Sequence, residues 1–151
     1  MTRRQYTQNF QKILKWCRER RCEIVKGKEY MFQSHQDRNF IYTPMRSDYK
    51  SAIMFILHEC GHLVVERDER YSQKFPFYHK GEQDLRSKNT KLYKMDILRE
   101  ETKAWETAFE LFKELDIKGL EFEELVRKAN EMLFTYSEWV HSRDKSDNAW
   151  E

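Results

Sequence analysis

The chain has few of the residues that interrupt regular structure, with four glycines and two prolines among 151 residues. Because Gly and Pro mark turns most strongly, their scarcity predicts long helices and strands. Cysteine is also rare: Cys17, Cys22 and Cys60 cannot all pair, and their spacings match neither a zinc ribbon nor a redox pair. We therefore expect reduced thiols and an intracellular protein.

No hydrophobic run is long enough to cross a membrane. The longest apolar stretch, Ile53 to Val65, is interrupted by His58, Glu59 and His62, whereas a spanning helix needs about 20 apolar residues. The opening residues MTRRQYTQNF lack the apolar segment of a secretory signal. These absences predict a cytoplasmic protein with no membrane partner.

The length and charge favour one domain over residues 1–151, large enough to bury a core without disulfides. The net charge is only +2, but residues 1–28 carry nine Lys and Arg against two Glu. Such a segment can contact nucleic acid or an acidic partner. No nucleic-acid-binding motif accompanies it, so a solvated helix face is the favoured interpretation. The sequence does not indicate an oligomeric state.

Hydrophobic periodicity predicts four helices and three strands. Pro44 and the capping pair Ser47-Asp48 separate the last strand from the second helix, and residues 67–91, which show no periodicity, are expected to form a flexible loop. The final residues, 142–151, are expected to fray. The expected elements are a helix over about Thr7–Arg20, strands at Cys22–Lys26, Tyr30–Ser34 and Asn39–Thr43, and helices to about Glu66, over Tyr93–Leu115 and over Glu121–His141. Short turns between the strands predict an antiparallel sheet, and hence an α+β fold.

His58, Glu59 and His62 form an HExxH motif inside the second expected helix. Residues four apart lie on one helical face, so the two imidazoles can converge on one metal ion. Glu59 is rotated by about 100° from His58, where it can take a proton from a metal-activated water. HExxH on a helix is typical of zinc peptidases. Gly61, between the histidines, leaves backbone open to a close approach by a strand or substrate.

The motif and the order of the elements resemble those of the gluzincins, in particular ImmA/IrrE-like peptidase domains and related HExxH peptidases of phages and mobile elements. The likeness spans about Cys22 to Leu115 and includes an ExxAW pattern formed by Glu101, Ala104 and Trp105, where gluzincins often have ExxAD. The resemblance implies a zincin-like fold, with a protein or peptide as substrate. It also implies His58, His62 and Glu101 as zinc ligands and Glu59 as general base. A substrate peptide is expected to add to the edge of the sheet.

Several alternatives remain open at this point. Trp105 replaces an Asp that orients a zinc-bound histidine in many gluzincins, so that partner must come from elsewhere in the chain. Glu100 and His79 are the other candidates for the third ligand; a third histidine would resemble the SprT-type proteases. The alternative function is a non-catalytic, zinc-containing binding or inhibitory protein that acts on a host or partner factor.

Overall fold

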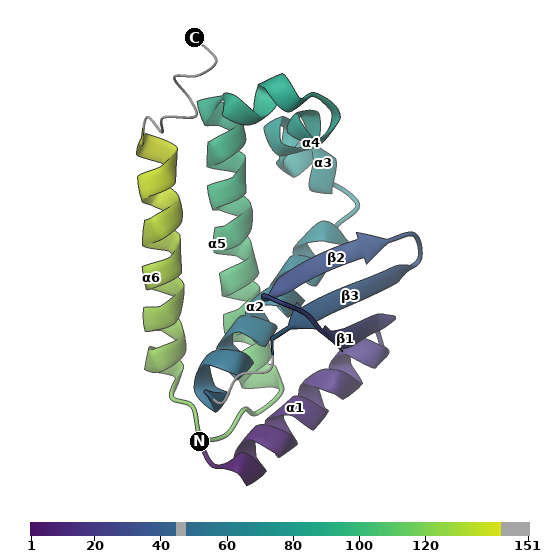
Figure 1. The fold of residues 1–151 in the computed structure, drawn as a ribbon, viewed down its shortest axis with the longest axis vertical. Helices are drawn as coiled ribbons and strands as arrows, with labels where there is room; N and C mark the ends of the chain where they lie inside the picture. The colour runs from purple at the N-terminus through teal and green to yellow at the C-terminus, as the bar shows by residue number, and fades with distance from the viewer. Residues whose placement is uncertain (45–47, 143–151) are drawn as a thin grey trace.

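The computed structural model describes residues 1–44 and 48–142, and in these residues it has an α+β architecture built from helices and a small three-stranded sheet (Figure 1). The elements follow the chain as α1 (Arg3–Arg18), β1 (Cys22–Lys26), β2 (Met31–His35), β3 (Arg38–Thr43), α2 (Tyr49–Glu66), α3 (Tyr71–Lys74), α4 (Pro76–Gln83), the 3-10 helix η1 (Leu85–Asn89), α5 (Lys91–Glu114) and α6 (Phe122–His141). The α+β class is therefore confirmed. The expected fraying of residues 142–151 falls almost entirely outside the described residues.

The sheet is mixed, so the prediction of an antiparallel sheet is wrong. Its strand order is β1-β3-β2; β1 pairs with β3 in parallel and β2 pairs with β3 antiparallel. Gly27 at the end of β1 still donates a hydrogen bond to Thr43 of β3, so the chain does not turn back after β1. The residues after Gly27 instead carry the chain past β3, and β2 becomes the edge strand on the far side.

The burial of the strands explains which of them is central. β3 contributes Asn39 and Ile41 to the interior, and its other residues from Phe40 to Thr43 are half-buried. In β2 only Phe32 is even half-buried. A strand with apolar residues on both faces belongs in the middle of a sheet, whereas a polar strand tolerates an edge. Turn residues alone predict that strands adjacent in the sequence pair with each other. Here the burial of β3 places it between β1 and β2 instead.

Helix α2 lies at the centre of the molecule, between the sheet, α1 and the long helix α5 (Figure 1). Its predicted start is confirmed, because the Asp48 side chain caps it by accepting a hydrogen bond from the Ser51 N–H. Ser47 is outside the described residues. Helix α1 begins at Arg3, earlier than expected, because Thr2 and Gln5 form a capping box.

Gly61 allows α2 and α5 to come very close. A Cβ atom at Gly61 would lie 2.1 Å from the carbonyl oxygen of Ala104, so any side chain there would force the two helices apart. The open backbone thus faces a neighbouring helix, and not the strand or substrate expected from the sequence. This contact sets the spacing between the HExxH helix and the helix that carries Glu101.

All three cysteines are buried and free, as expected for reduced thiols. They belong to one hydrophobic core, in which the sulfur atoms of Cys17 and Cys60 lie 3.8 Å apart. Among the helices of the described residues, none has the length and apolar character needed to cross a membrane.

Residues 67–91 contain the short helices α3, α4 and η1. The prediction that this segment has no secondary structure is therefore wrong. These helices are short, and a periodicity analysis needs longer windows to detect them. Helix α4 begins with Pro76 and is capped by another helix: the Asp96 carboxylate of α5 accepts hydrogen bonds from the N–H groups of Phe77 and Tyr78 at 2.8 and 3.2 Å. The flexibility of the segment stays a prediction.

Asp96 provides a test of that flexibility. Asp96→Ala leaves two helical N–H groups without their cap, at a cost of about 1–2 kcal/mol. We expect limited proteolysis between residues 67 and 91 to become about 5- to 30-fold faster, because the opened population rises by that factor. Asp48→Ala, which removes the cap of α2, is the matched control and should not accelerate cleavage there. Equal rates in the two variants would show that the Asp96 contact does not hold the segment.

Candidate metal centre

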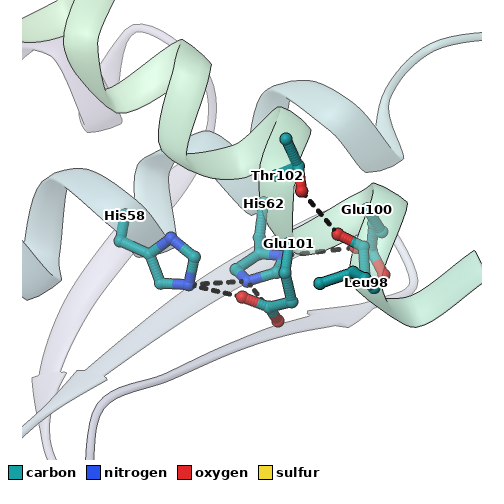
Figure 2. A network of polar contacts seen from close by, with 6 residues as sticks. All are labelled: His58, His62, Leu98, Glu100, Glu101 and Thr102. Carbon is teal, nitrogen blue, oxygen red and sulfur yellow. Dashed lines mark hydrogen bonds and ion pairs between the residues drawn. The ribbon is translucent and has the colours of Figure 1, made fainter. Parts of the chain in front are cut away.

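His58 and His62 lie one turn apart on α2, and their rings point to a common space beside α5 (Figure 2). Their Nε2 atoms are 3.1 Å apart. Both side chains are largely buried, with 9% and 12% of their surface exposed. The two rings face the same space because residues four apart lie on one face of a helix.

Glu101 of α5 completes a group of three. Its carboxylate oxygens lie 2.8 Å from Nε2 of His58 and 3.1 Å from Nε2 of His62 (Figure 2). One donor atom from each residue lies within 4.8 Å of the others, so the group could hold a metal ion. Four-coordinate metals at about 2.0–2.1 Å from N and O ligands require ligand atoms roughly 3.3 Å apart. The observed separations of 2.8 to 3.1 Å are all within about 0.5 Å of that value.

The hydrogen bonds of His62 also fit a metal ligand. Nδ1 of His62 lies 3.1 Å from Oε1 of Glu100, so an Nδ1–H can donate to this carboxylate. Nε2, which contacts Glu101 without a metal ion, is then the nitrogen that can bind one. A carboxylate behind a ligating histidine fixes the tautomer and orients the ring. Glu100 therefore supplies the partner that Trp105 cannot, although the sequence suggested Glu100 only as a rival ligand.

Trp105 holds the other histidine by stacking. Its ring lies against that of His58 with centroids 4.1 Å apart and an interplanar angle of 18°. Nδ1 of His58 is buried and has no hydrogen-bond partner in the structure. A packing contact with Trp105, and not a hydrogen bond, therefore positions the ring of His58.

The protonation states of His58, His62 and Glu101 depend on one another, because their side chains are in contact. Burial opposes the charge on Glu101, yet hydrogen bonds donated by His58 and His62 lower the pKa of Glu101 to about 2. Burial also acts against a charged His62, but its bonds to Glu100 and Glu101 raise the pKa of His62 well above its usual value. For His58, burial dominates and lowers the pKa. The arrangement favours positive charge between the two carboxylates, which a proton or a metal cation can provide.

Glu59 is separate from the group of three. It is 7% exposed and lies beside the histidines in the same cleft. The nearby backbone N–H of Phe32 in the edge strand β2 favours its charged form. Burial raises the pKa of Glu59 to about 7. A carboxylate near neutral pKa, placed beside the metal-binding atoms and not among them, has the properties of a general base.

The group lies in a cleft of about 560 Å³ between α2, β2, α5 and α6. Tyr136 of α6 lines this cleft close to Glu101. Burial raises the pKa of Tyr136, so its hydroxyl keeps its proton and remains a donor. Sequence reasoning missed this role because Tyr136 belongs to the apolar stripe of the last helix. Among Tyr71, Tyr78 and Tyr93, only Tyr78 lines the cleft.

The structure separates the remaining candidates from the group. His79 is exposed on α4 and contacts Gln83 at 3.3 Å, and it is not among the grouped residues. Glu106 and Glu110 are exposed on α5. Glu66 is half-buried and lines the cleft one turn beyond His62. None of the Lys and Arg residues of segment 1–28 lines the cleft.

No protein-family model, curated protein or solved structure matches this chain.

Proposed function

We propose that this protein is a zinc-dependent peptidase with a zincin-like fold of the gluzincin type, in which His58, His62 and Glu101 hold the ion. One observation carries the proposal: two imidazole nitrogens and a carboxylate converge at the side of an open cleft, next to the buried Glu59. Two nitrogen ligands and one carboxylate are a ligand set of catalytic zinc, which leaves one position open. A bound zinc ion supplies Lewis-acid polarisation of a carbonyl and makes water acidic near neutral pH.

The protein side chains have distinct parts in this reaction. Glu59 takes the proton of the attacking water and delivers it to the leaving amine. Tyr136 can donate its hydroxyl proton in a hydrogen bond to the oxygen that becomes negatively charged. Glu100 keeps His62 in the required tautomer through the 3.1 Å contact with Nδ1.

The edge of the sheet offers a place for the peptide. In the hairpin of β2 and β3, His35 pairs with Arg38 across the two-residue turn. Hydrogen-bonded and non-bonded positions alternate along an antiparallel pair, so the backbone groups of Phe32 and Ser34 point away from β3. The backbone N–H of Phe32 also favours the charged form of Glu59, which agrees with this direction. A peptide added to this edge would pass beside Glu59.

Metal analysis tests the proposal directly. Purified protein is expected to hold about one zinc ion per chain, as a three-residue site requires, and to cleave an unstructured protein such as casein. Removal of the ion by a chelator should lower the melting temperature, because the site ties α2 to α5, and added zinc should restore it. Absence of zinc under metal-replete conditions would overturn the proposal. One bound zinc without any hydrolysis would favour the non-catalytic binding protein.

A further inference from the structure

The cleft has two chemically different ends. Tyr30, directly before β2, stacks on Phe55 of α2 with centroids 5.0 Å apart, and Met132 of α6 lines the same end. Beyond the histidines, in the opposite direction along α2, the lining residues are Glu66 and Tyr78. One end thus carries mainly apolar and aromatic side chains, with the exposed Glu29 next to Tyr30, and the other presents the half-buried Glu66 carboxylate and a phenol ring.

Glu66 has no partner for its charge. Within residues 1–44 and 48–142, the Glu66 side chain takes part in no ion pair or hydrogen bond. Burial, and then the nearby Glu100 carboxylate, raise the pKa of Glu66 to about 7. A half-buried carboxylate among other carboxylates is costly unless a cation joins it.

The rest of the cleft adds to the negative potential. Its lining includes Glu29, Glu59, Glu66, Glu100 and Glu101, but no lysine or arginine among the described residues. A divalent ion on His58, His62 and Glu101 would offset only part of this charge. Clefts lined by one sign of charge concentrate ligands of the opposite sign, and Tyr78 offers an aromatic ring beside Glu66, a surface that cations also prefer.

We propose that the Glu66 end of the cleft binds a cationic group of the substrate, either a Lys or Arg side chain or a free α-amino group. This inference rests on the proposed peptidase function and names its substrate class. The contacts of Tyr30 with Phe55 and of Phe32 with Glu59 show that β2 and α2 run in the same direction along the cleft. A peptide antiparallel to β2 therefore places its cationic group on the N-terminal side of the zinc site and an apolar residue on the C-terminal side.

The test measures binding without turnover, using zinc-loaded Glu59→Gln protein and fluorescence anisotropy. The probes are end-blocked, labelled alanine octapeptides in which one Lys, norleucine or Glu is moved through every position. At one position at least, Lys should bind ten-fold or more tightly than norleucine or Glu, because its ammonium meets an unpaired carboxylate. Matched peptides with a free or an acetylated N-terminus, both lacking Lys, show whether an α-amino group has the same effect.

The variant Glu66→Gln, added to Glu59→Gln, should reduce this preference to less than three-fold with zinc content and melting temperature unchanged. Glu110→Gln removes the same charge from the exposed face of α5 and should preserve the preference. The inference is overturned if no cationic peptide binds more tightly than its neutral match, or if the preference survives Glu66→Gln. Absence of zinc from the wild-type protein, or of hydrolysis by its zinc-loaded form, contradicts the proposed function instead, and the binding measurement remains independent of turnover.

Discussion

Replacement of Glu59 by Gln is expected to lower peptide hydrolysis by about 10²–10⁴-fold while the zinc content stays at about one ion per chain. The amide has nearly the same shape as the carboxylate but cannot accept the proton of the attacking water. Glu59 is buried beside the histidines and outside the group of three, so its loss should not disturb metal binding. Steady-state kinetics and elemental analysis of the same preparation provide both measurements.

Glu110→Gln is the matched control for this experiment, because it makes the same chemical change on an exposed surface. It should retain full activity. Loss of zinc from the Glu59→Gln protein would place Glu59 among the ligands and refute the assigned roles. Unchanged hydrolysis would show that a different group serves as the base.

Replacement of Glu101 by Ala is expected to weaken zinc binding at least a hundred-fold, about 2.8 kcal/mol. Its carboxylate contacts Nε2 of both histidines at 2.8 and 3.1 Å, so the substitution removes one of three ligands. Glu100→Ala should cost less, about ten-fold, because Glu100 acts on the metal only through Nδ1 of His62. Competition with a chromogenic chelator gives the dissociation constants.

His79→Ala and Glu110→Ala complete this series as controls. Both side chains are exposed and outside the group of three, so zinc affinity should remain at the wild-type value in each. A larger loss with Glu100→Ala than with Glu101→Ala would exchange the two roles on α5. A large loss with His79→Ala would refute the gluzincin interpretation and favour a site of three histidines.

Neighbouring residues on α5 show where sequence reasoning reaches its limit. Glu100 and Glu101 are both carboxylates, and on a helix they differ by about 100° in direction. Periodicity therefore shows that one of them can face α2 but not which one. In the structure both contact His62, Glu101 at Nε2 and Glu100 at Nδ1, because the ring lies between them.

Local interactions made much of the remaining architecture predictable. The start of α2 follows from the Asp48 cap, and the common face of His58 and His62 follows from helical geometry alone. The strands were also located from sequence to within about one residue, but not their pairing. Strand pairing depends on which strand is buried from both sides, and the turn residues carry no information about that.

The sequence by itself thus determined the four long helices, the three strands and the HExxH pair, since these depend on residues within a few positions of one another. Only the tertiary structure decided the order β1-β3-β2, the capping of α4 by Asp96, and the position of Tyr136 beside Glu101. It also decided the approach of α5 to α2 at Gly61 and Ala104, which brings Glu101 to the histidines. These features join residues far apart in the chain, and their geometry is set by the packing of whole helices against one another.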